Sequence, residues 1–114
     1  MAKRKYYHQK LIRDRIPEFI KACGDEFETK VMDNSEFEKE LKKKLVEEAK
    51  ELAHASKESL LNELSDVLEL VKSIASQYKI KFQEIDRYQI EKRKKRGGFK
   101  KKLFLIWSTG KAGK

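Results

Sequence analysis

The chain has 114 residues, of which 41% are charged and 39% are hydrophobic, and its formal net charge is +9 at pH 7. This length suits one domain with a small core. The single cysteine, Cys23, excludes a disulfide scaffold and a zinc site built from several thiolates. The longest apolar run, Leu103–Trp107, is far shorter than the ~20 residues of a membrane-spanning helix. We therefore expect a cytoplasmic protein with no secretory signal and no membrane partner.

The positive charge is concentrated in one segment. Residues 92–102 contain eight basic residues and no acidic residue, and they supply nearly all of the net charge. A basic excess commonly indicates a nucleic-acid partner. Because this excess is local, it also fits a small anionic partner.

One proline and five glycines favour long helices over an all-β fold. A short first helix is predicted to begin near Ile16, with Pro17 in its first turn, and to end at Gly24. A second helix is predicted to run to about residue 55. Ser35 is its expected N-cap, with Glu38 completing a capping box.

A third helix is predicted from residue 60 to about residue 78, after a short connection, and a fourth from residue 82 to 95. Gly97 and Gly98 are expected to stop the fourth helix. The segments near 28–32 and 102–107 have strand character, which allows a minor β-hairpin between them. Residues 1–107 are expected to form one domain and residues 108–114 a disordered tail. The predicted fold is a small all-α bundle with two antiparallel central helices.

The two central helices carry acidic residues beside their apolar stripes. Glu48 and Glu51 lie one turn apart on the second helix, and Glu63 and Asp66 lie one turn apart on the third. Burying four such carboxylates without a counter-charge costs several kcal/mol per group. A hard divalent cation, Mg²⁺ or Mn²⁺, would compensate for their charge. The alternative is that they belong to solvated helix faces, because Glu and Lys are abundant in this chain.

The order Glu48-x-x-Glu51 and then Glu63-x-x-Asp66 resembles the metal-binding signature of the all-α nucleoside triphosphate pyrophosphohydrolases, the MazG-like superfamily. That group also contains phosphoribosyl-ATP pyrophosphohydrolase and dimeric dUTPases. Residues 10–18 and 92–99 resemble the opening and closing motifs of a small phosphoribosyl-ATP pyrophosphohydrolase-like branch, and the likeness spans about residues 8–106. One departure is the gap of eleven residues between Glu51 and Glu63, which is at or below the short end of the family's usual gap. Such a gap leaves little chain to shape a base pocket.

The resemblance implies hydrolysis between the α- and β-phosphates of a nucleoside triphosphate, giving a monophosphate and pyrophosphate, as in house-cleaning enzymes. It also implies a homodimer or an assembly of dimers. Magnesium, or manganese, would be held by the four carboxylates, and Glu47 is the candidate catalytic base. The alternative for Glu47 is a solvated ion pair with Lys43 or Lys50.

Phosphate groups also need cationic partners. Arg93 and Arg96 are candidates because guanidinium groups match phosphate oxygens, and Gly97 and Gly98 would let the backbone approach an anion. Arg13 is a further candidate. The alternatives are a helix stop followed by a solvated basic tail and, for Arg13, a structural ion pair with Asp14.

Two other functions compete with the nucleotide hydrolase. Residues 92–102 could form a nucleic-acid-binding module, although the chain has no helix-turn-helix, zinc or RNA-recognition signature. The chain could also be a helical dimerisation protein whose carboxylates are only surface charge. The hydrolase interpretation makes the nucleic-acid partner unlikely, because the basic segment then binds the phosphates of a small substrate.

Overall fold

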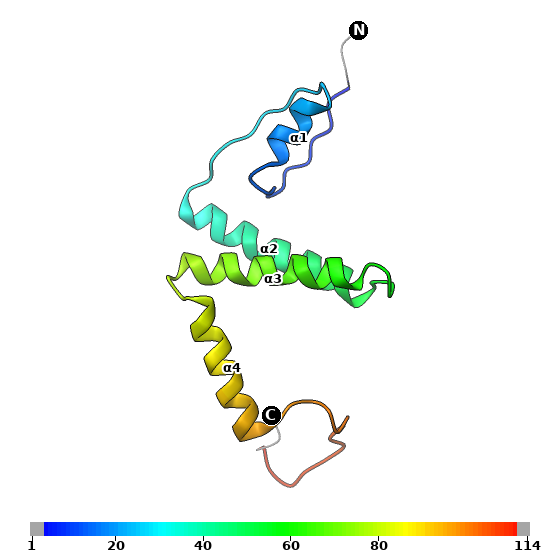
Figure 1. Ribbon diagram of the computed structural model, residues 1–114, viewed down its shortest axis with the longest axis vertical. Coiled ribbons are helices and arrows are strands. Elements are labelled where there is room, and N and C mark those ends of the chain that lie inside the picture. Colours follow the sequence, from blue (N-terminus) through cyan, green and yellow to red (C-terminus); the bar gives the residue numbers. More distant parts are fainter. Residues whose placement is uncertain (1–3, 112–114) are drawn as a thin grey trace. The chain divides into compact units, whose positions relative to one another are not determined.

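The computed structural model describes residues 4–111, which contain four α-helices and no β-strand (Figure 1). The helices are α1 (Ile16–Ala22), α2 (Asn34–Ala53), α3 (Leu60–Gln77) and α4 (Phe82–Arg96). The predicted all-α fold is confirmed. Within the described part of the chain, no helix is long and apolar enough to cross a membrane.

The chain divides into two compact units, Met1–Lys79 and Ile80–Lys114. The first unit contains α1, α2 and α3, and the second contains α4. Residues 108–111, the described part of the expected tail, form no helix or strand, and residues 112–114 lie outside the described residues. The single domain over residues 1–107 stays a prediction.

Helix α1 follows the sequence expectation. Its first turn contains Pro17, whose missing N–H group is not needed there. Gly24 follows the end of the helix with a φ angle of +77°, a left-handed conformation that favours glycine.

Helix α2 begins earlier than the predicted capping box. Asp33 is the N-cap, and its carboxylate accepts a hydrogen bond of 2.8 Å from the backbone N–H of Glu36. Ser35 therefore lies inside the first turn, and the prediction of Ser35 as the cap is wrong. The physical reason is that a carboxylate at this position both accepts the bond and interacts favourably with the helix dipole. Glu38 does not complete a capping box but accepts a hydrogen bond of 2.8 Å from Lys42.

Helices α2 and α3 form an antiparallel hairpin, in which the two helices lie side by side (Figure 1). Near the open end of the hairpin, the Tyr78 hydroxyl donates a hydrogen bond to Glu38. Among the described residues, the buried core consists of Leu41 from α2 and of Leu70 and Ala75 from α3. This hairpin positions the carboxylates, because residues on its facing sides approach one another from both helices.

The second unit begins with α4, whose first turn is closed by a bond of 3.4 Å from the Lys81 backbone N–H to the Glu84 carboxylate. The helix ends at Gly97, which has a φ angle of +81°, so the predicted helix stop is confirmed.

The segments 28–32 and 102–107 do not form strands in the described chain, so the minor β-hairpin is a wrong expectation. Val31 is fully exposed, and Phe104 and Ile106 are nearly so. A strand is stable only when its backbone groups are paired and one face is covered. The described residues give neither segment that support.

Candidate metal centre

The antiparallel hairpin brings three of the four predicted metal ligands together. Glu48 from α2 and Glu63 and Asp66 from α3 each offer one carboxylate oxygen, and these oxygens all lie within 4.8 Å of one another. All three residues are partly buried. We call Glu48, Glu63 and Asp66 the carboxylate cluster. Its geometry agrees with the spacing argument, while metal binding by these residues stays a prediction.

Glu51, the fourth predicted ligand, is exposed and does not belong to the carboxylate cluster. Its negative charge nevertheless acts on both Glu48 and Glu63, whose pKa values it raises. Glu51 is therefore an exposed neighbour of the carboxylate cluster and not one of its three members.

The carboxylate cluster is electrostatically unfavourable without a cation. Burial raises the pKa of Glu48, and the negative charges of Glu51 and Asp66 raise it further, against a smaller opposite effect of Lys44. The pKa of Glu63 is raised by the same causes in the same order, burial first and then Glu51 and Asp66. A carboxyl group whose ionised form is disfavoured by burial and by like charges is one that a bound cation would stabilise.

Two oxygen atoms of the cluster lack a hydrogen-bond partner. The Oε2 atoms of Glu48 and Glu63 are buried, and no described residue donates to either of them. Most buried polar atoms in proteins are hydrogen-bonded, and one left unpaired costs about 1–3 kcal/mol. These two orphaned oxygens, one from each helix, fit the donor set that a hard divalent cation requires.

Two basic side chains compensate for part of the negative charge. The Lys44 Nζ atom lies 3.9 Å from the Oε1 atom of Glu48, and an Arg13 guanidinium nitrogen lies 2.9 Å from the Oδ1 atom of Asp66. Within residues 4–111, no other ion pair reaches the cluster. With Glu51 counted, two positive groups face four carboxylates, so negative charge remains in excess.

The position of Arg13 corrects the sequence-based alternative, because Arg13 pairs with Asp66 and not with Asp14. The two partners are 53 positions apart in the sequence, and no local pattern could have indicated their contact. Lys44 was also missed, although it lies four residues before Glu48 on α2, a spacing that commonly joins opposite charges.

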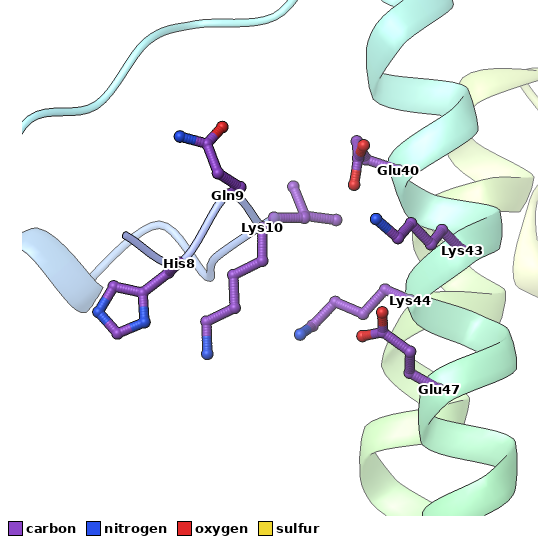
Figure 2. A pocket seen from close by; sticks show the side chains of 8 residues that line it. His8, Gln9, Lys10, Glu40, Lys43, Lys44 and Glu47 are labelled. Carbon is purple, nitrogen blue, oxygen red and sulfur yellow. The ribbon is translucent and has the colours of Figure 1, made fainter. Parts of the chain in front are cut away.

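Glu47 faces a different environment from the carboxylate cluster. It lines a pocket of about 190 Å³ between residues 8–11 and α2 (Figure 2). Glu47 is exposed, as the alternative of a solvated residue expects, but in the described part of the chain no ion pair joins it to Lys43 or Lys50. Its role as a catalytic base stays a prediction.

The predicted phosphate-binding residues of the basic segment belong to the second unit. Arg93 and Arg96 lie in the last turn of α4, and Gly97 and Gly98 follow it; all four are exposed. A Cβ atom added at either glycine would meet no atom within 4 Å, so close packing does not explain them. The positive φ of Gly97 explains that residue as a helix stop, whereas phosphate binding by the four residues stays a prediction.

Comparison with known proteins adds no family assignment. No family model, curated protein or solved structure matches the chain. The geometry of the carboxylate cluster and the order of its residues in the sequence are therefore the features that indicate a function.

Proposed function

We propose that the chain is a Mg²⁺-dependent nucleotide pyrophosphohydrolase of the MazG-like, phosphoribosyl-ATP pyrophosphohydrolase-like type. The observation that carries this proposal is the convergence of Glu48, Glu63 and Asp66, with oxygens within 4.8 Å of one another and two buried oxygens unpaired. The order Glu48-x-x-Glu51 and Glu63-x-x-Asp66 supports it, since the two motifs lie on the facing helices of one hairpin.

The donor set favours a hard cation. All three groups of the carboxylate cluster are carboxylates, and the group contains no histidine or cysteine. Mg²⁺ and Mn²⁺ prefer oxygen ligands, and Mg²⁺ commonly retains waters and binds through one or two carboxylates together with substrate phosphates. The carboxylate cluster would hold the cation, and Glu51 would supply a further carboxylate on the exposed side.

In the proposed reaction, the oxygen of a water molecule forms a bond to the α-phosphorus of a nucleoside triphosphate. The bond from that phosphorus to the α–β bridging oxygen breaks, and pyrophosphate leaves with the electron pair. A bound Mg²⁺ would neutralise phosphate charge and lower the pKa of water. Glu47, an exposed residue that lines the pocket beside α2, is our candidate acceptor for the proton of the water.

We propose that Arg13 has one role in the protein without metal and another in the complex with substrate. It neutralises Asp66 through their ion pair, yet its own side chain is 58% exposed. A cation bound at the carboxylate cluster would replace Arg13 as the partner of Asp66, which leaves the guanidinium group available to a phosphate. Arg93 and Arg96, with Gly97 and Gly98, are the further phosphate contacts that we propose.

We also propose that the functional form is a homodimer or an assembly of dimers. Only three hydrophobic side chains are buried among the described residues, which is a small core for a chain of this length. Helix α3 leaves four leucines exposed, namely Leu60, Leu61, Leu64 and Leu68. A second copy would remove this apolar surface from water.

The reaction is tested by incubating the purified chain with Mg²⁺ and a panel of canonical nucleotides, modified nucleotides and phosphoribosyl-ATP. The assay distinguishes released pyrophosphate from released phosphate. We expect pyrophosphate from at least one substrate, and we expect EDTA or Glu63→Gln to abolish its release. Glu69→Gln is the matched control, since Glu69 lies on the same helix but outside the carboxylate cluster. The absence of pyrophosphate release across the panel would reject the proposal.

A further inference from the structure

The pocket beside α2 lies in the same unit as the carboxylate cluster. Residues 8–11 form one wall, and Glu40, Lys43, Lys44 and Glu47 form the other (Figure 2). Residues 40, 43, 44 and 47 recur at helical spacing, so α2 presents them on one face. Among the residues that line the pocket, only Glu47 and Lys44 also have a role in the proposed reaction or contact its metal centre.

Three lysines give the pocket its chemistry. Lys10, Lys43 and Lys44 all line it, against the two carboxylates of Glu40 and Glu47. Within the described residues, neither Lys10 nor Lys43 forms an ion pair, even though both carboxylates are nearby. Three lysines and two carboxylates that line one concave surface leave an excess of positive charge, which attracts anions.

Lys44 connects this pocket to the carboxylate cluster. Its ammonium group lies 3.9 Å from Glu48, and its side chain is only 25% exposed. Figure 2 shows Lys44 extending from α2 toward the segment that carries Lys10. An anion held in the pocket would therefore lie beside Lys44, and Lys44 also contacts a member of the carboxylate cluster.

The size of the pocket limits the ligand. Its volume of about 190 Å³ is below the roughly 300–1,000 Å³ of pockets that enclose drug-sized molecules. A compact diphosphate group suits such a space better than a nucleoside does. Its oxygens would accept hydrogen bonds from the three lysines, whose positive charge exceeds the negative charge of Glu40 and Glu47.

We propose that this pocket binds a diphosphate group, the part of the substrate that leaves as pyrophosphate. The assignment to a nucleotide substrate rests on the proposed function, whereas binding of pyrophosphate by the pocket does not. The proposal places phosphate contacts on the first unit, where the carboxylate cluster also lies.

The test is a calorimetric titration with inorganic pyrophosphate in EDTA, in which neither metal binding nor turnover contributes. We compare the wild-type chain, the double variant Lys10→Gln/Lys43→Gln and the charge-matched control Lys57→Gln/Lys79→Gln. Lys57 and Lys79 belong to the first unit, are exposed, and do not line the pocket. Lys44 is left intact because it contacts Glu48.

We expect saturable binding to the wild-type chain and to the control, and binding at least about tenfold weaker in the Lys10/Lys43 variant. Circular dichroism checks that both double variants fold. If the Lys10/Lys43 variant does not fold, the single variants Lys10→Gln and Lys43→Gln are measured instead. Equal weakening in variant and control would overturn the proposal, because it would show only general attraction to a basic protein. The absence of saturable binding to the wild-type chain would overturn it as well.

These outcomes are separate from those of the hydrolase assay. A chain that hydrolyses nucleotides but binds pyrophosphate independently of Lys10 and Lys43 retains the proposed function and loses this pocket. A chain that binds pyrophosphate through Lys10 and Lys43 but hydrolyses nothing supports the pocket and refutes the proposed function.

Discussion

At the scale of single residues, the ionised carboxylate of Glu63 is disfavoured in the folded state without a cation. Its pKa is raised by burial and by Glu51 and Asp66, and one of its oxygens is buried and unpaired. Glu63→Gln keeps the shape of the side chain and removes its charge. We therefore expect this variant to unfold at a higher temperature than the wild-type chain at pH 7.5 in EDTA.

Addition of Mg²⁺ should give the wild-type chain a higher unfolding temperature than the Glu63→Gln variant. A ligand at about 100 times its Kd stabilises the folded state by about 2.7 kcal/mol, and the Glu63→Gln variant should gain much less of this stabilisation than the wild-type chain. Thermal unfolding with and without Mg²⁺ measures both effects, with Glu69→Gln as the control that should follow the wild-type chain. An equal Mg²⁺-induced shift in the Glu63→Gln variant would contradict a role of Glu63 in metal binding.

The raised pKa values of Glu48 and Glu63 also predict how stability depends on pH. In the folded state both groups keep their protons above the ordinary value of 4.5. Their contribution to stability is therefore fully present below pH 4.5 and is lost as the pH rises through their folded-state pKa values. Glu38 has the opposite effect, because hydrogen bonds from Lys42 and Tyr78 lower its pKa.

A difference measurement isolates the two raised groups. We compare the free energy of unfolding in urea for the wild-type chain and for Glu48→Gln/Glu63→Gln, in EDTA, from pH 4.5 to pH 7.5. The advantage of the double variant should grow as the pH rises, because Gln does not ionise. An advantage that is constant or shrinks over this range would disprove the stated electrostatics of the carboxylate cluster.

Arg13 should compete with the metal ion for Asp66. Their contact is 2.9 Å, but both side chains are partly exposed, so the pair is worth at most about 1 kcal/mol. Arg13→Gln is expected to tighten Mg²⁺ binding by up to about fivefold, as measured by calorimetry. Arg15→Gln is the matched control, because Arg15 pairs with Glu18 rather than with the carboxylate cluster. Weaker Mg²⁺ binding in the Arg13 variant would show that Arg13 supports the site instead of competing for it.

At the scale of secondary-structure elements, the start of α2 depends on Asp33. Its carboxylate accepts the hydrogen bond from the Glu36 backbone, and loss of an N-cap usually costs about 1 kcal/mol. Asp33→Ala should lower the free energy of unfolding by about that amount in a urea titration, whereas Ser35→Ala should change it little. A larger loss for Ser35→Ala than for Asp33→Ala would mean that the helix begins where the sequence alone predicts.

Some features of these helices can be predicted from the sequence, and others cannot. Proline and glycine near α1 and α4 predict those helix ends correctly, because each residue type has a strong and local backbone preference. The convergence of Glu48 with Glu63 follows from helical spacing and a short connection. Asp33 and Ser35 are both good caps, so pattern alone could not choose between them. The ion pair of Arg13 was not predictable, because tertiary structure determines it.

At the scale of the whole molecule, the exposed leucines of α3 are the basis of the proposed dimer. Leu61 and Leu68 lie seven residues apart on one side of the helix, and they are 80% and 43% exposed. We expect the chain to sediment as a dimer of its 13.5 kDa monomer. Leu61→Lys/Leu68→Lys should shift it toward the monomer by adding charge to an apolar contact.

The control for this prediction is Val31→Lys, which changes a fully exposed apolar side chain outside α3. It should leave the sedimentation coefficient unchanged. A wild-type chain that remains monomeric at concentrations of tens of micromolar would contradict the proposed dimer, while leaving the metal centre of the hairpin to be tested separately.

The most direct test of the central claim is a titration of the chain with Mn²⁺, with free Mn²⁺ measured by electron paramagnetic resonance. The wild-type chain should bind Mn²⁺ saturably, and Mg²⁺ should compete for the same site. Glu48→Gln and Glu63→Gln should each weaken binding at least about tenfold, since each removes one of the converging carboxylates. Binding of equal strength in the wild-type chain and in both variants would show that the carboxylate cluster is not a metal centre.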